Sequence, residues 1–199
     1  QETVPSRQFD ISKIDFDLLS REFAHTRRKN LLLRDLDELV NQQLSKMLFA
    51  NPQRIDYYDR YQEIIDAYNA EQNRATIEKT FMDLMELASS LDTEQQRYVR
   101  EGFSSDEELS VYDLLFSENL TKQEIETIKK VSVDLLTKIK RQIAKLDHWT
   151  DKQETKAIVD NLIRNTLWQE LPNSYDISDI QTYQKKIYEY VYMRYPEVA

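Results

Sequence analysis

The residue types that could perform chemistry are few in this chain and lie far apart. Its two histidines, His25 and His148, are more than 120 positions apart, whereas a zinc site or a histidine-based triad needs further ligands or a positioned nucleophile. The chain has no cysteine, so it forms neither disulfides nor thiolate zinc sites. We therefore expect no catalytic, metal or cofactor site, and we interpret both histidines as surface or interface residues.

One short pattern matches the letters of metal-dependent nucleases, in which an Asp and a Glu-x-Lys converge on a phosphate from adjacent strands. Here Asp151 precedes Glu154, Thr155 and Lys156. The pattern falls in the first turn of a predicted helix, where acidic residues complement the helix dipole. Because a short motif without its strand context is weak evidence, we interpret these residues as a helix start.

A basic segment is the strongest candidate for a binding surface. Between residues 121 and 146, seven basic residues stand against three acidic ones. They spread around the polar arc of a predicted helix, so their long side chains can cover apolar surface while the charges stay in water. We favour a solvated or partner-facing surface over contact with nucleic acid. The candidate partner or DNA contacts are Lys129, Lys130, Lys138, Lys140, Arg141 and Lys145.

The composition restricts both the fold and the partners. One Gly in 199 residues, against an ordinary share of about 7%, leaves almost no position for a phosphate-binding loop or a tight hairpin turn. This argues against a Rossmann fold, a P-loop, a β-sandwich or a propeller. The net charge of −9 disfavours nonspecific binding to nucleic acid or anionic membrane. No apolar run approaches the roughly 20 residues of a spanning helix, so we expect no membrane contact and a cytoplasmic location.

Helical periodicity is the dominant pattern. Apolar residues recur at the i, i+3, i+4, i+7 spacing of an amphipathic helix, and capping boxes such as Thr121/Glu124 and Ser178/Gln181 indicate helix starts. Gly102 is placed to end a helix in the left-handed conformation. The predicted fold class is all-α, an irregular bundle of roughly nine helices. The predicted helices span residues 15–28, 31–49, 52–72, 76–90, 94–101, 105–116, 122–146, 151–170 and 179–195.

Changes in composition predict how the chain is divided. The first residues lack helical periodicity, and residues 1–13 are predicted to be a linker. An acidic stretch, 92–118, is followed by the basic segment, and this change of sign predicts a boundary that separates helical subdomains at 14–116 and 117–199. The chain begins without Met or an apolar leader, so we expect it to be a piece of a longer protein.

Several segments, taken in order and spacing, resemble one known family. They are Ile-Asp-Phe-Asp-Leu-Leu-Ser-Arg-Glu-Phe at 14–23, Asn-Pro-Gln-Arg-Ile-Asp-Tyr-Tyr-Asp-Arg-Tyr-Gln at 51–62, Ile-Ile-Asp-Ala-Tyr-Asn at 64–69, Phe81–Met85, Arg100–Gly102, Tyr112–Leu115, Trp149 with Gln153, Leu171 and Pro172 with Tyr175, and Val191–Pro196. From about residue 14 to 196, the chain resembles the C-terminal region of the R (restriction and motor) subunit of type I restriction enzymes. No single segment is a catalytic signature.

The resemblance implies a fragment of an ATP-dependent, site-specific deoxyribonuclease, a hydrolase. In that family the R subunit carries a nuclease domain and motor domains that use ATP and Mg²⁺ to pull DNA. Its helical C-terminal region helps to attach it to the methyltransferase core of M and S subunits. The implied partners are the M and S subunits, the motor domains of the same chain, and DNA in the full complex.

The family's nuclease and ATPase motifs do not occur in this sequence, so no catalytic residue is carried over to it. ATP and Mg²⁺ are implied only for the parent subunit, and we expect this segment itself to be non-catalytic. The alternative is a stand-alone helical adaptor that binds other proteins.

Overall fold

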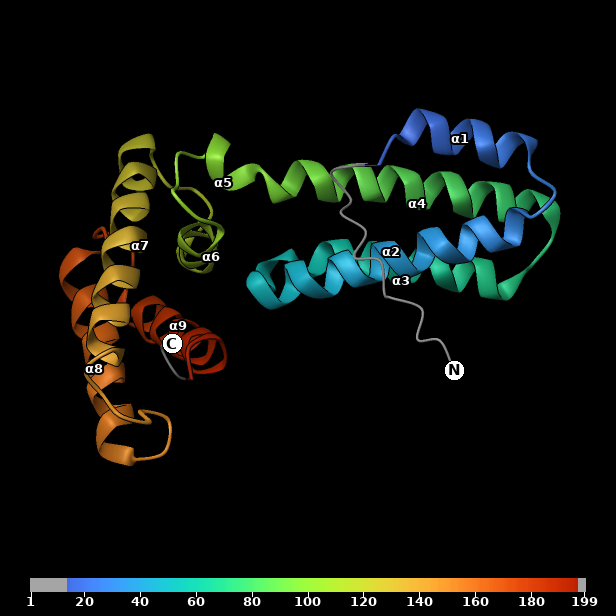
Figure 1. Ribbon diagram of the computed structural model, residues 1–199. Coiled ribbons are helices and arrows are strands. Elements are labelled where there is room, and N and C mark those ends of the chain that lie inside the picture. The colour runs from blue at the N-terminus through green and yellow to red at the C-terminus, as the bar shows by residue number, and fades with distance from the viewer. Residues whose placement is uncertain (1–13, 197–199) are drawn as a thin grey trace. The chain divides into compact units, whose positions relative to one another are not determined.

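The structure is a computed structural model that describes residues 14–196 (Figure 1). Within that range the regular elements are nine α-helices and one 3₁₀ turn, without a strand, which confirms the all-α prediction. The predicted linker at 1–13 lies outside the described residues. The helices are α1 (Phe16–His25), α2 (Lys29–Ala50), α3 (Ile55–Ala70), α4 (Arg74–Gln95), α5 (Arg97–Arg100), α6 (Asp106–Leu115), α7 (Lys122–Ile143), α8 (Gln153–Glu170) and α9 (Ile177–Arg194), with the 3₁₀ turn η2 (Pro52–Arg54) before α3.

Local side-chain chemistry determines where several helices begin and end. Thr121 starts α7 with the predicted capping box, because its hydroxyl accepts from the Glu124 N–H while the Glu124 carboxylate accepts from the Thr121 N–H at 2.8 Å. Gly102 follows α5 with a φ of 83°, the left-handed conformation expected of it. The box predicted at Ser178 lies two residues earlier, at Asp176, whose carboxylate is an equally good acceptor for the first turn of α9.

The chain divides into two compact units between Arg97 and Tyr98, and we call these unit 1 and unit 2. The division predicted from charge was later, at 116/117. The structural reason for the difference is that the acidic α6 and the basic α7 pack against each other. Leu109 and Leu115 of α6 are fully buried in the same core as α7. The change in charge therefore lies inside unit 2.

Unit 1 is built around α4. Phe81 and Leu84 of α4 are fully buried, and both α2 and α3 pack against this helix (Figure 1). Helix α1 is joined to this core through Phe23, whose ring stacks on Phe81 with the ring centroids 3.6 Å apart. Lys29 lies over the same Phe23 ring at 4.7 Å from its centroid, a cation–π contact. Aromatic stacking on α4 therefore positions α1.

A buried ion-pair network lies at the end of α4. Arg54 and Glu94 are 4% and 7% exposed, and the Arg54 Nε donates to Glu94 Oε1 at 3.0 Å. The Nε of Arg97 donates to both oxygens of the same carboxylate, at 2.8 and 2.9 Å. Asn51, which is fully buried, orients this region by accepting from the Gln53 N–H at 3.1 Å. The Asn-Pro-Gln-Arg segment at 51–54 thus has a structural role, because it places the Arg54 guanidinium in the interior of unit 1.

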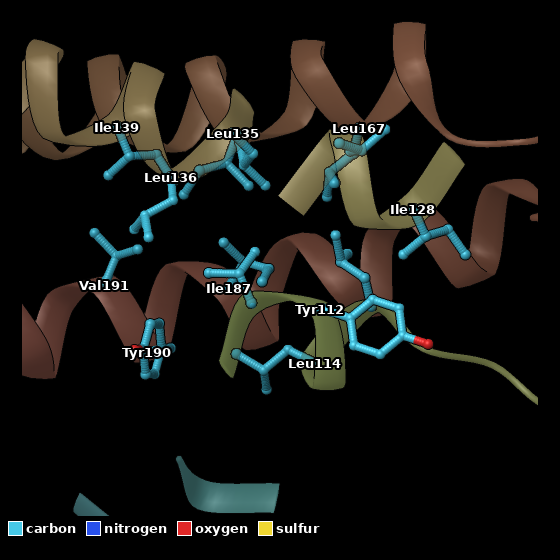
Figure 2. Close-up of a cluster of buried hydrophobic side chains, with 14 of the residues drawn as sticks. Tyr112, Leu114, Ile128, Leu135, Leu136, Ile139, Leu167, Ile187, Tyr190 and Val191 are labelled. Carbon is cyan, nitrogen blue, oxygen red and sulfur yellow. The ribbon is translucent and has the colours of Figure 1, made fainter. Parts of the chain in front are cut away.

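Unit 2 is a four-helix arrangement in which α7 packs between α6 and α8, while α9 contacts both α8 and α6. Figure 2 shows side chains of α7, among them Leu136 and Ile139, facing Ile187 and Val191 of α9 across the core. Leu135, Ile139, Ile187 and Val191 have no exposed surface. Burial of this apolar surface is the main source of stability for a fold of this kind.

Two aromatic residues fix the connections of unit 2. Trp149, which is 1% exposed, donates from its indole Nε1 to the backbone oxygen of Tyr195 at 2.6 Å, which holds the end of α9 to the α7–α8 connection. The hydroxyl of Tyr175 donates to the backbone oxygen of Leu115 at 2.6 Å, which holds the α8–α9 connection to the end of α6. Both loops are therefore tied to helix ends.

We predict that Glu94→Gln destabilises unit 1 by about 3–5 kcal/mol, because it removes the charge of a buried carboxylate to which both Arg54 and Arg97 donate. Denaturant unfolding followed by far-UV circular dichroism would measure the loss. Both tryptophans, Trp149 and Trp168, belong to unit 2, so their emission follows that unit separately. The exposed Glu63→Gln is the matched control, with an expected change within about 0.5 kcal/mol. Equal stability of the two variants would contradict the prediction.

Candidate functional site

Helix α7 carries the candidate contacts, and its core packing determines how they point. Ile128, Leu135 and Ile139 have no exposed surface, so one face of the helix is held against the other helices of unit 2. The capping box lowers the pKa of the Glu124 carboxyl, mainly through hydrogen bonds from Thr121. Because the first turn of α7 and its buried face are both fixed, each basic side chain of this helix points in a defined direction.

Lys129 points toward the start of unit 2. Its Nζ lies 3.1 Å from a carboxylate oxygen of Glu101 and donates to the Glu101 backbone oxygen at 3.0 Å. It also lies over the rings of Phe103 and Tyr112, at 6.0 and 5.9 Å from their centroids. A cation held by a carboxylate, a carbonyl and two aromatic faces has its interactions satisfied within the unit.

Lys138 connects α7 to α8. Its Nζ lies 2.5 Å from carboxylate oxygens of both Asp134 and Glu170. Hydrogen bonds to Asp134 and Glu170 raise the pKa of Lys138 above its usual value. The ammonium therefore stays charged and acts as an intramolecular link.

Lys140 connects α7 to α6 and to the end of α9. It forms an ion pair with Glu107, and its Nζ lies 5.3 Å from the centroid of the Tyr195 ring. Burial of Glu107 opposes ionisation, but the hydrogen bond and charge of Lys140 contribute to the opposite effect, so the pKa of the Glu107 carboxyl is lowered overall. The acidic and basic stretches of the sequence meet at this pair.

The remaining three candidates, Lys130, Arg141 and Lys145, are exposed, and no ion pair engages them within residues 14–196. Lys130 and Arg141 are eleven residues apart, which places them within about 20° of each other around the helix. Lys145 follows in the turn directly after α7. We call these three residues the α7 basic face. The structure thus separates six predicted contacts into three internal links and three outward cations.

The other chemical candidates do not converge in the described part of the chain. His25 and His148 are both exposed, and the described residues contain no group of three potential metal ligands. Glu154 is exposed in the first turn of α8, while Lys156 lies over the ring of Tyr192 at 5.7 Å from its centroid. The nuclease-like letters are therefore part of a helix start, as interpreted.

The two tryptophans differ in burial. Trp149 is 1% exposed and packs in the core of unit 2, whereas Trp168 on α8 is 58% exposed. Its neighbour Leu167 is fully buried, and adjacent residues on a helix point in different directions. The two could have been distinguished from the α8 periodicity, since Val159, Ile163 and Leu167 define its buried face.

None of the helices within residues 14–196 combines the length and apolar character required to cross a bilayer.

We predict that the Glu107–Lys140 link makes unit 2 sensitive to acid. The pKa of Glu107 is lower in the folded protein than its usual 4.5, so the stabilisation is complete above that value and is lost as pH falls through the folded pKa. In urea unfolding followed by tryptophan emission, Glu107→Gln should be less stable than the parent chain at pH 7. The difference should shrink by about pH 3.5.

The exposed Glu118→Gln serves as the control for this measurement, and it should follow the parent chain at both pH values. If the difference in unfolding free energy between Glu107→Gln and the parent chain stays constant with pH, the acid sensitivity does not come from the Glu107–Lys140 pair.

Comparison with known proteins identifies the family. A family model described as type I restriction enzyme HindI endonuclease subunit-like, C-terminal, matches residues 3–195. No curated protein and no solved structure matches the chain. The family match covers nearly the whole chain and confirms the predicted resemblance. This chain belongs to the C-terminal family of type I restriction enzyme HindI endonuclease subunit-like proteins.

Proposed function

We propose that this chain is an assembly element, which attaches the endonuclease (R) subunit to the methyltransferase core formed by M and S subunits. In this proposal it also supports the motor domains of the same polypeptide, and a cytoplasmic location follows from that role. Nuclease and ATPase chemistry, with its ATP and Mg²⁺, belongs to other parts of the parent enzyme. Family membership supports this role over that of a stand-alone helical adaptor.

The observation that carries the proposal is the α7 basic face. Lys130, Arg141 and Lys145 are exposed cations on or directly after a helix whose opposite face is anchored in the core. A charged surface on a rigid support speeds encounter with a surface of opposite sign and disfavours wrong partners. The acidic surface of a partner protein is the occupant that we assign to it.

Contact with DNA is the second candidate, because the same three cations could bind phosphates. Two features favour the protein partner. The chain carries a net charge of −9, and exposed acidic residues, Glu126 and Asp134, stand on α7 among the cations. Long-range repulsion would weaken binding to a polyanion, whereas a protein surface of mixed charge can match a mixed pattern.

We predict that charge reversal of the α7 basic face, as K130E/R141E/K145E, lowers recovery of the full 199-residue chain with a purified M and S core by at least about tenfold at low salt. The lost attraction and the new repulsion act together, and added salt should reduce the difference. Circular dichroism should show unchanged helicity, because none of the three side chains forms an ion pair with the described residues of unit 2.

The matched control is R21E/R27E/K46E, which changes the net charge by the same amount at exposed positions of unit 1. Its recovery should stay within about twofold of the parent chain. Equal loss in both triple variants would mean that net charge alone governs recovery and would contradict the assignment. If the parent chain binds a short DNA duplex, and only K130E/R141E/K145E loses that binding, the result would favour the DNA candidate.

A further inference from the structure

An apolar groove of about 400 Å³ lies between α1 and α4 in unit 1. Figure 1 shows these two helices side by side, and the stacked rings of Phe23 and Phe81 hold them together. Apolar atoms provide most of the groove surface, with Phe16 on one side and Met82 and Met85 on the other. The groove is therefore formed by two helices that this aromatic contact joins.

Met82 makes this groove unlike the rest of the α4 surface. Its side chain is 58% exposed, whereas Met85 beside it is buried at 8%. An exposed methionine next to a buried one offers a flexible, polarizable surface that can adapt to different apolar side chains. Grooves of this kind accept the apolar face of an amphipathic helix.

The rim of the groove is acidic. Asp17 of α1 and Asp83 and Glu86 of α4 are among its lining residues, and none of the lining residues within 14–196 is basic. Glu86 forms one surface ion pair, with Arg60 at 3.0 Å, while Asp17 and Asp83 have no ion pair among the described residues. Three carboxylates around an apolar floor repel one another, and a cationic occupant would relieve that repulsion.

We infer that the α1–α4 groove binds a basic amphipathic helix of a partner protein. Apolar side chains of that helix would pack on Phe16, Met82 and Met85, and its Lys or Arg side chains would pair with the acidic rim. About two turns span the distance from Met82 to Ser89. This inference rests on the proposed assembly function for the kind of partner, and it assigns that partner to a surface separate from the α7 basic face.

Isothermal titration of the full 199-residue chain tests the groove directly. The probe is a 14-residue helical peptide of Leu and Lys arranged with helical periodicity, and a peptide with Glu in place of Lys is its counterpart. The Lys peptide should bind and the Glu peptide should not. D17N/D83N/E86Q should weaken binding of the Lys peptide by at least about tenfold.

The control D56N/D59N/E63Q removes the same charge from exposed positions of α3, and it should change affinity by less than about twofold. A second pair separates the apolar contribution. Met82→Ser should weaken binding, whereas Leu18→Ser, a substitution on α1 at an exposed residue outside the groove lining, should not. Thermal unfolding of each variant shows whether the fold is retained.

Equal losses in the two carboxylate variants, or no binding of the Lys peptide, would overturn the inference. Binding of both peptides with the same affinity would also overturn it. Peptide binding and recovery with the M and S core are independent measurements. A chain that binds the Lys peptide but is not recovered with the core contradicts the assembly role. A chain that is recovered but does not bind the Lys peptide contradicts the inference about the groove.

Discussion

Burial of one face of α7 is the constraint on which unit 2 depends. Ile128, Leu135 and Ile139 have no exposed surface, and their spacing leaves the helix one rotational setting in which all three are removed from water. That setting also determines the direction in which each lysine side chain of α7 points. Those at the edges of the buried face reach carboxylates on neighbouring elements, and those opposite it point into solvent. Hydrophobic packing thus decides which cations hold the unit together and which remain available.

Unit 1 differs because two oppositely charged side chains, those of Arg54 and Glu94, are buried in its interior. The η2 turn places Arg54 in the interior, where its guanidinium pairs with the carboxylate of Glu94. Arg97 donates to the same carboxylate. A buried pair of this kind tolerates the loss of neither partner. Several segments that carried the family resemblance have structural roles of this type, as the buried side chains of Arg54, Trp149 and Tyr175 show. In these three segments the resemblance therefore falls on residues that hold the fold together, whereas the segments 14–23 and Phe81–Met85 also supply lining residues of the α1–α4 groove.

Much of the fold could be predicted because its causes are local. Helical periodicity, the Thr121/Glu124 capping box and the left-handed Gly102 each depend on residues within a turn or two of one another. The division between the units could not be predicted from charge. A change from acidic to basic residues, as between α6 and α7, is expected at a boundary between subdomains, but it is equally expected between two helices that attract each other. The Glu107–Lys140 ion pair shows that α6 and α7 are of the second kind.

The sequence by itself determined that this protein is helical, that it lacks the glycines and cysteines of most phosphate and metal sites, and which segment is basic. Those properties follow from composition and short-range spacing. Only the tertiary structure decided that Lys138 and Lys140 are internal links, while Lys130 and Arg141 are exposed and make no ion pair with residues 14–196. It also decided that α1 and α4 line an apolar groove with an acidic rim. The physical reason is that the partners of a long charged side chain lie on other helices, about 30 residues away in sequence for these links, where spacing along the chain carries no information.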